Sequence, residues 1–149
     1  MSIILVDMDG TLDLGSGRPN EAMIARLRES GETIYILSAR NKGRLEETRS
    51  WLTKYDVPHQ EVYLNEFPAG PSSELRWKRY KAEKLIADGA EIALAVDNNA
   101  AVRRIYRSLG IEAISPAAFI GPRSVKDLEG MHGKELMDHL KRMADEEHA

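Results

Sequence analysis

The sequence predicts an α/β fold in which helices cover both faces of a central parallel β-sheet. Short, wholly apolar runs such as Ile3–Val6 and Ile92–Val96 alternate along the chain with longer amphipathic stretches. Strands that are apolar throughout, and not only at every second residue, are typical of a parallel sheet buried on both sides. Regular alternation of strands with helices favours the same architecture, because parallel neighbours need a long crossover connection.

The first three elements show this alternation most clearly. Ile3–Val6 is apolar throughout and predicts a buried strand. Glu21–Ser30 predicts a helix because its apolar residues fall on one side, with Asn20 as a candidate N-cap and Gly31 just past its end. Thr33–Leu37, rich in β-branched and aromatic residues, predicts the second strand.

The middle of the chain continues the pattern. Arg44–Tyr55 predicts a helix, since its apolar positions recur with helical spacing, and Val62–Leu64 predicts a short strand. The segment 65–73, NEFPAGPSS, is rich in helix and strand breakers and predicts a loop. A helix over Glu74–Ala87 follows, and we expect it to end at Asp88-Gly89.

The last part of the sheet and the C-terminal tail complete the prediction. Ile92–Val96 and Ile111–Ile114 predict strands, with a helix over Ala100–Leu109 between them. After about residue 116 the chain becomes rich in Pro and Gly, and helical spacing returns only over Lys134–Met143. We expect residues 117–149 to form a C-terminal extension whose helix either docks on the sheet or binds a partner.

Composition indicates a globular protein without strong electrostatic bias. A net charge of −3 over 149 residues gives no overall footprint of nucleic-acid binding, so any basic site must be local. The absence of cysteine excludes disulfides, thiolate nucleophiles and thiolate metal sites. No apolar run approaches the roughly 18 residues of a membrane helix, and the start does not resemble a signal peptide. We expect a single cytoplasmic domain over residues 1–149, with its core over about 1–116 and no membrane partner.

Reactive side chains follow several predicted strands. The first strand runs directly into Asp7 and Asp9 of the sequence DMDGT. Two carboxylates so close raise each other's pKa and cost free energy unless a cation or a reaction uses them. Ligands of parallel α/β sheets bind beyond the carboxyl ends of the strands, so these groups should meet. They suit Mg²⁺, which prefers oxygen ligands, and leave one carboxylate as a candidate nucleophile. Polar residues also follow two other predicted strands: Ser38-Ala39-Arg40 comes after Thr33–Leu37, and Asp97-Asn98-Asn99 comes after Ile92–Val96.

This set of residues resembles the four motifs of the haloacid dehalogenase superfamily of phosphohydrolases. The family has DxDx[TV], a Ser or Thr ending the second strand, a Lys, and an acidic pair ending a later strand. The order and spacing match over about Ile3 to Pro116, which implies a Rossmann-like three-layer sandwich. The matching residues are Asp7-Met8-Asp9-Gly10-Thr11, Ser38, a lysine within Lys78–Lys84, and Asp97-Asn98.

The resemblance also implies a role for each matched residue. Asp7 would attack phosphorus and form an aspartyl-phosphate. Asp9 would protonate the leaving oxygen, activate the hydrolytic water and ligate Mg²⁺ through its backbone carbonyl. The residues expected to bind substrate phosphate are Thr11, Ser38, Ala39, Arg40 and a lysine, and the expected metal ligands are Asp7, Asp9, Asp97 and Asn98.

The phosphate-binding lysine is open to two assignments. Lys81 has Trp77 four residues before it and Leu85 four residues after, which places it on the apolar face of its helix, pointing inward. An inward lysine is costly without a partner, so we prefer Lys81. Lys78 is the alternative, since it lies one turn nearer the edge where the site should form.

Asn98 departs from the family pattern, which usually has a second carboxylate at this position. An amide oxygen is able to ligate Mg²⁺ but brings no charge, so the affinity for the metal could be weaker or the coordination rearranged. A non-catalytic member of the family is therefore an alternative.

Substrate class depends on the segments between the motifs. Neither the gap from Thr11 to Thr33 nor the gap from Arg40 to the lysine has room for a cap domain, so we expect an open site. Open sites suit large substrates such as nucleic-acid ends. The stretches Ser38-Ala39-Arg40, 48–51 and 95–111 are similar to the 3′-phosphatase domains of phage polynucleotide kinase–phosphatases. In that family the arginine of the serine motif helps to bind substrate phosphate.

Three functions remain open at this point. The first is a Mg²⁺-dependent phosphatase that acts on nucleic-acid ends or nucleotides. The basic and aromatic stretch Arg76–Lys81 could then contact the nucleic acid, although an amphipathic helix with Trp77 in the core explains this stretch better when it is taken alone. The second is a phosphatase for a small metabolite or a phosphoprotein, and the third is a non-catalytic phosphate- or metal-binding module. The oligomeric state is open.

Overall fold

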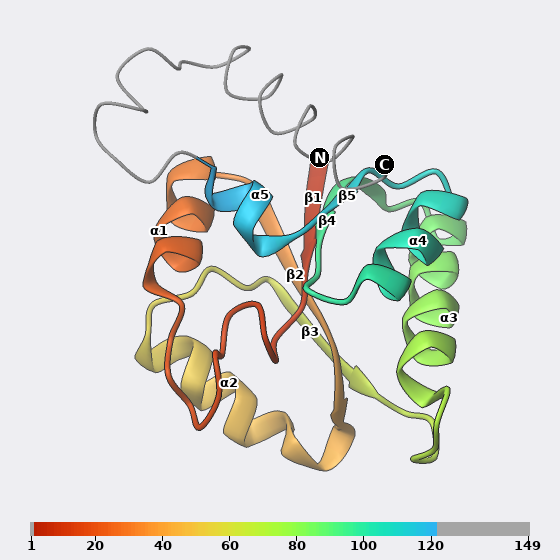
Figure 1. The fold of residues 1–149 in the computed structure, drawn as a ribbon, viewed down its shortest axis with the longest axis horizontal. Coiled ribbons are helices and arrows are strands. Elements are labelled where there is room, and N and C mark those ends of the chain that lie inside the picture. Colours follow the sequence, from red (N-terminus) through yellow and green to blue (C-terminus); the bar gives the residue numbers. More distant parts are fainter. Residues whose placement is uncertain (1, 122–149) are drawn as a thin grey trace.

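The computed structural model describes residues 2–121, which form a five-stranded parallel sheet flanked by helices (Figure 1). The strand order is β3-β2-β1-β4-β5, so β1 is the central strand. This arrangement confirms the predicted parallel α/β fold. The expected helix at 134–143 lies outside the described residues. The strands are β1 (Ser2–Val6), β2 (Thr33–Asn41), β3 (Glu61–Asn65), β4 (Glu91–Val96) and β5 (Ala113–Ile114).

Helices pack on both faces of the sheet and give a three-layer sandwich (Figure 1). On one face lie α1 (Glu21–Ser30), α2 (Leu45–Lys54) and α5 (Pro116–Ile120), whose apolar residues join a core cluster with Ile4 and Val6 of β1. On the other face lie α3 (Ser73–Ala87) and α4 (Ala100–Ser108), which pack around Leu5. Because alternate side chains of β1 enter opposite cores, the strand has to be apolar throughout.

The N-terminal half follows the sequence prediction closely, and α1 begins and ends where its signals place it. The Asn20 side chain accepts a hydrogen bond from the backbone N–H of Met23 at 3.3 Å. Gly31 has φ of 65°, a left-handed conformation that lets its N–H bond back to the helix. Local capping chemistry therefore sets both ends of this helix.

Two elements differ from the prediction. β2 continues to Asn41, so Ser38 and Arg40 lie inside the strand, where the pairing with β3 shifts register after Leu37. α5 was not expected, because the chain becomes rich in Pro and Gly from about Pro116. Proline is accommodated in the first helical turn, where its missing N–H is not needed, and Ser115 caps this helix by accepting from Ala118 N at 3.1 Å.

The carboxyl edge of the sheet carries no inserted domain within the described part of the chain. The connection from β1 to α1 is the loop 7–20, and the stretch between β2 and α3 holds only a 3₁₀ turn, Lys42–Arg44, followed by α2 and β3. This agrees with the expectation of an uncapped site. Across residues 2–121, no helix has the length and apolar character needed to cross a membrane.

Candidate active site

A buried ammonium group lies at the carboxyl edge of the sheet, between the ends of its two central strands. Lys78 Nζ of α3 lies 2.9 Å from Asp7 Oδ1, at the end of β1, and 2.7 Å from Asp97 Oδ2, at the end of β4. It also lies 3.2 Å from Glu74 Oε2. The Lys78 side chain is 0% exposed, so these carboxylates replace water as its partners.

Lys81, the lysine preferred from the sequence, is not part of this cluster, whereas Lys78, the alternative, lies at its centre. Its ammonium lies 4.1 Å from the ring centroid of Tyr63, on the side of α3 that packs over β3. The apolar side of α3, which carries Trp77, packs against the sheet and directs Lys81 towards β3 and not towards the site. The spacing of Glu74 and Lys78, an i,i+4 pair, was the signal that pointed to the right lysine.

The cluster carries more negative than positive charge. Burial raises the pKa of Asp7 to about 7, and the neighbouring Asp97 adds to this, while Lys78 opposes it. Burial also raises the pKa of Asp97. Burial alone would lower the pKa of Lys78. The attraction of the neighbouring carboxylates is larger, however, and it holds the pKa of this ammonium well above its usual value. A cation or a proton added near Asp7 would therefore be stabilised.

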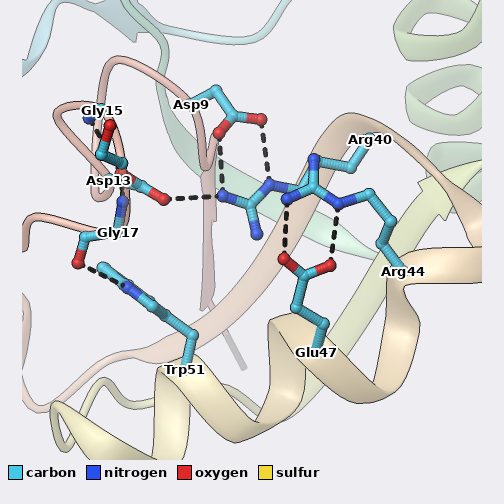
Figure 2. A pocket seen from close by; sticks show the side chains of 9 residues that line it. Asp9, Asp13, Gly15, Gly17, Arg40, Arg44, Glu47 and Trp51 are labelled. Atoms are coloured by element: carbon cyan, nitrogen blue, oxygen red, sulfur yellow. Dashed lines mark hydrogen bonds and ion pairs between the residues drawn. The ribbon is translucent and has the colours of Figure 1, made fainter.

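Asp9, the second carboxylate of DMDGT, points away from Lys78 and is bound by Arg40 instead (Figure 2). Arg40 Nε donates to Asp9 Oδ2 at 3.0 Å and its Nη2 donates to Asp9 Oδ1 at 2.8 Å. This bidentate hydrogen bonding holds the pKa of Asp9 below its usual value. The two carboxylates of the motif thus have separate cations and pKa values shifted in opposite directions.

Arg40 itself is fixed by two residues that the sequence analysis missed. Its Nη2 donates to Asp13 Oδ2 at 2.9 Å and its Nη1 donates to the buried Thr48 Oγ1 at 3.2 Å. Asp13 Oδ1 accepts from the backbone N–H groups of Gly15 and Gly17, which ties the loop after β1 to the same arginine. Most of the guanidinium donors of Arg40 are therefore used within the protein, and the expected phosphate contact stays a prediction.

Asn98 lies across the mouth of the site, against Gly10. In the orientation that satisfies both ends of its amide, the nitrogen donates to Asp7 Oδ2 at 2.8 Å and to the Asp9 carbonyl at 3.0 Å. A Cβ atom on Gly10 would lie 2.7 Å from Asn98 Cγ, and Gly10 has φ of +85°, so only glycine fits here. The glycine of DMDGT makes room for this contact.

The other predicted residues also lie at this edge. Thr11 is buried and its hydroxyl donates to Asp7 Oδ2 at 3.3 Å. Ser38 is buried, with its Oγ accepting from the Arg40 N–H and its carbonyl accepting from the Trp77 indole at 2.9 Å. Ala39, which lies between Ser38 and Arg40 in the chain, is half-buried. Trp77 is thus a core residue, and it is not available to stack on a nucleic-acid base.

A hollow of about 390 Å³ opens beside Asp9 (Figure 2). Figure 2 shows the guanidinium groups of Arg40 and Arg44 side by side in it, the second paired with Glu47 at 3.0 Å. Trp51 of α2 closes one side and donates through its indole N–H to the Gly17 carbonyl at 2.9 Å. This volume is in the range of small-molecule sites. The lining consists of Asp9, Asp13, Gly15, Ser16, Gly17, Arg40, Arg44, Glu47 and Trp51.

The capacity of the site for a metal depends on three oxygens. Within residues 2–121, no three His, Cys, Asp or Glu side chains form a group that could hold an ion. Asp97 is engaged elsewhere, since one oxygen accepts from Lys78 and the other from the Asn99 N–H at 2.8 Å. If Asn98 presents its oxygen, however, that atom lies 2.8 Å from Asp7 Oδ2 and 3.0 Å from the Asp9 carbonyl. Adjacent ligands of octahedral Mg²⁺ are about 2.9 Å apart, so these residues fit the ion.

Comparison with known proteins identifies the fold. No protein-family profile matches the chain, and no curated protein matches it significantly. Among solved structures, 76% of the chain superposes on a chain of the Pnkp1/Rnl/Hen1 RNA repair complex, with 16% identity and a TM-score of 0.58. A second structure of that complex gives 18% identity and a TM-score of 0.55. The core domain of a protein assigned as a phosphoglycolate phosphatase from Streptococcus pneumoniae matches 87% of the chain, with 13% identity and a TM-score of 0.51.

The chain has a haloacid dehalogenase-like fold. This confirms the fold that the resemblance of its motifs implied. The match covers 93% of the streptococcal core domain but only 42% and 45% of the chains in the repair complex, so the chain spans less than half of those proteins. Within the haloacid dehalogenase-like fold, the residues described above occupy the carboxyl edge, where parallel α/β proteins bind their ligands.

A first prediction concerns the pH dependence of stability in the absence of divalent cations. Because the pKa of Asp7 rises from 3.8 to about 7 on folding, the folded protein binds more protons than the unfolded chain between these values. The contribution of Asp7 to stability is therefore complete below about pH 4 and is lost as the pH rises through 7. Asp7→Asn cannot titrate, so it should not lose stability in this way. As the pH rises from 4 to 7, the unfolding free energy of the variant, measured with urea, should therefore increase relative to that of the wild type. If the difference in unfolding free energy between variant and wild type stays constant with pH, the raised pKa of Asp7 is contradicted.

A second prediction concerns Thr48, which supports Arg40. Thr48→Val keeps the shape of the side chain but leaves a buried guanidinium N–H without its acceptor, which should cost about 1–3 kcal/mol in unfolding free energy. Thr48→Ser keeps the hydroxyl and is the matched control, with a smaller loss expected. A loss in Thr48→Ser as large as or larger than that in Thr48→Val would contradict the weight given to this hydrogen bond.

Proposed function

We propose that the protein is a Mg²⁺-dependent phosphomonoester hydrolase that acts through an aspartyl-phosphate. The observation that supports this best is the environment of Asp7. One of its oxygens is bound by the buried ammonium of Lys78, and the other lies beside the Asp9 carbonyl and Asn98. A carboxylate held in this way at the end of the central strand is oriented as a nucleophile.

In the first step, an oxygen of Asp7 attacks phosphorus and the bond from phosphorus to the leaving oxygen breaks. The products are a mixed anhydride on Asp7 and an alcohol, whose oxygen takes its proton from the Asp9 carboxyl group. Arg40 favours the ionised form of Asp9, so proton donation works against the lowered pKa of this group. Protonation of an alcohol leaving group therefore uses the minor, protonated form of Asp9.

In the second step, the ionised Asp9 takes a proton from water, and the water oxygen attacks phosphorus. The bond from phosphorus to Asp7 breaks, which releases inorganic phosphate and regenerates the carboxylate. The interaction with Arg40 favours this step, because it keeps Asp9 in the basic form. Lys78 places a fixed positive charge beside Asp7, where it stabilises the phosphoryl oxygens.

The proposed ligands of Mg²⁺ are Asp7, the Asp9 carbonyl and Asn98. When bound, the ion would supply positive charge that neutralises phosphoryl oxygens. The buried carboxylates outnumber Lys78, and this excess negative charge favours a divalent cation. We assign Asp97 to holding Lys78, in place of the direct metal role expected from the sequence. The Thr11 hydroxyl lies 3.3 Å from Asp7 Oδ2, and we assign the binding of phosphoryl oxygens to the hydroxyls of Thr11 and Ser38.

For the substrate, we propose polynucleotide 3′-phosphates or nucleotides. The leaving group of a phosphomonoester bound at Asp7 must extend past Asp9, and the hollow beside Asp9 has room for a nucleoside. Arg44 is about half exposed there, and its surface ion pair with Glu47 is weak enough to exchange for a substrate phosphate. The fold similarity to a chain of an RNA repair complex supports the same class.

A small phosphorylated metabolite is the second candidate. The same hollow would hold such a leaving group, and its lining includes three carboxylates against two guanidinium groups, which does not favour a polyanion by charge alone. The extensive overlap with the core domain of the streptococcal protein assigned as a phosphoglycolate phosphatase supports this alternative.

The mechanism leads to a prediction about the two lysines. Asp7→Asn and Lys78→Met should each reduce phosphatase activity to a trace, because the first removes the nucleophile and the second removes the charge beside it. Lys81→Met is the matched control on the same helix and should retain most activity, since Lys81 contacts Tyr63. Activity should also disappear with a chelator and return with Mg²⁺.

Circular dichroism would confirm that the inactive variants are folded. A folded Asp7→Asn variant with substantial activity would rule out the covalent mechanism. A folded protein with no activity on any phosphomonoester would leave a non-catalytic phosphate- or metal-binding module.

A further prediction separates the two substrate classes. An oligonucleotide 3′-phosphate should be hydrolysed with higher kcat/KM than a nucleoside 3′-monophosphate, and raising the salt concentration should reduce the difference. Arg44→Ala should reduce this preference without reducing turnover of an aryl phosphate. Arg79→Ala is the control, because Arg79 is similarly exposed and ion-paired but lies on α3, across the sheet from the hollow. Equal efficiency on both substrates at low salt would favour the small-metabolite alternative.

A further inference from the structure

The amide of Asn98 occupies a position that two different groups could fill. One of its two polar atoms lies 2.8 Å from Asp7 Oδ2 and 3.0 Å from the Asp9 carbonyl, both of which are acceptors. A nitrogen at this point makes two hydrogen bonds, whereas an oxygen would face two other oxygens at close range. A cation among the three oxygens would favour the second arrangement, because it would be bound by all of them.

The two arrangements differ only by a half-turn of the amide plane. Nitrogen and oxygen exchange places, while the position of the side chain is set by its contact with Gly10, where no Cβ intervenes. Asn98 is exposed at the mouth of the site, so this rotation needs no opening of the core. Rotation of exposed side chains is fast compared with turnover.

We infer that Asn98 works in two orientations, as a hydrogen-bond donor that closes the cation-free site and as an oxygen ligand once Mg²⁺ binds. This inference rests on the proposed function for the identity of the cation. In the cation-free protein the amide N–H₂ takes the place of the cation between Asp7 and Asp9. An aspartate at this position has no donor, so it would add a third oxygen, and a second carboxylate, to this point. The stability of such a variant would depend on bound Mg²⁺.

The side-chain amide of Asn98 reports its orientation directly by NMR. In ¹⁵N-labelled full-length protein, its N–H₂ resonances are identified as the pair that is missing from Asn98→Asp. We expect Mg²⁺ titration to shift this pair strongly, because both hydrogen bonds are lost, together with the backbone amides of residues 7–11. If those backbone amides shift and the side-chain pair does not, or if no resonance shifts, the inference is wrong.

Thermal unfolding supplies a second, independent measurement. In chelator, Asn98→Asp should lower Tm by roughly 3–10 °C, and saturating Mg²⁺ should raise its Tm by more than it raises that of the wild type. Asn41→Asp is the matched control, because it adds the same charge at the same edge and keeps the acceptor that binds the Gly43 N–H. A Tm for Asn98→Asp in chelator at or above the wild-type value would overturn the inference.

These measurements need no turnover, so their outcome is separate from that of the phosphatase assay. A protein that shows both effects but hydrolyses no phosphomonoester would refute the proposed function and leave the role of Asn98 standing. An active protein whose Asn98 resonances do not move would refute this inference alone.

Discussion

The contact of Lys78 with Asp7 and Asp97 is the interaction on which the rest of the site depends. It joins the ends of β1 and β4 to α3, and it places one ammonium group among carboxylates that have almost no contact with water. Removal of one partner from a buried ion pair is strongly destabilising, because the remaining charge has no solvent to replace it. The geometry of Asp7, the proposed nucleophile, and the cohesion of the sheet edge therefore come from the same three side chains.

Arg40 has the equivalent position on the other side of the motif. Two carboxylates only two residues apart end up with different cations, and their pKa values move in opposite directions. Divergence of this kind between neighbouring acids is how proteins assign separate chemical roles to identical groups. Here burial causes the upward shift of Asp7, and a bidentate hydrogen bond causes the downward shift of Asp9.

The sequence was sufficient to predict the parallel sheet, the order of the helices and most of the residues at its carboxyl edge. Apolar runs and caps such as Asn20 depend on neighbouring residues in the sequence, so the sequence alone is enough to predict the strands and helices that they form. The choice between Lys78 and Lys81 was not local, because it depended on which side of α3 packs over β3. Thr48 and Asp13 were missed for a similar reason, since their importance comes from Arg40, a residue distant in the chain.

The two tryptophans of the chain lie in different environments on opposite faces of the sheet. Trp77 is buried and bonded to the Ser38 carbonyl, whereas Trp51 is only partly buried and lines the hollow beside Asp9. Their fluorescence should therefore separate two events within one emission spectrum. Ligand entry would change the emission of the indole at the hollow, while the indole in the core would respond only when the sheet and α3 come apart.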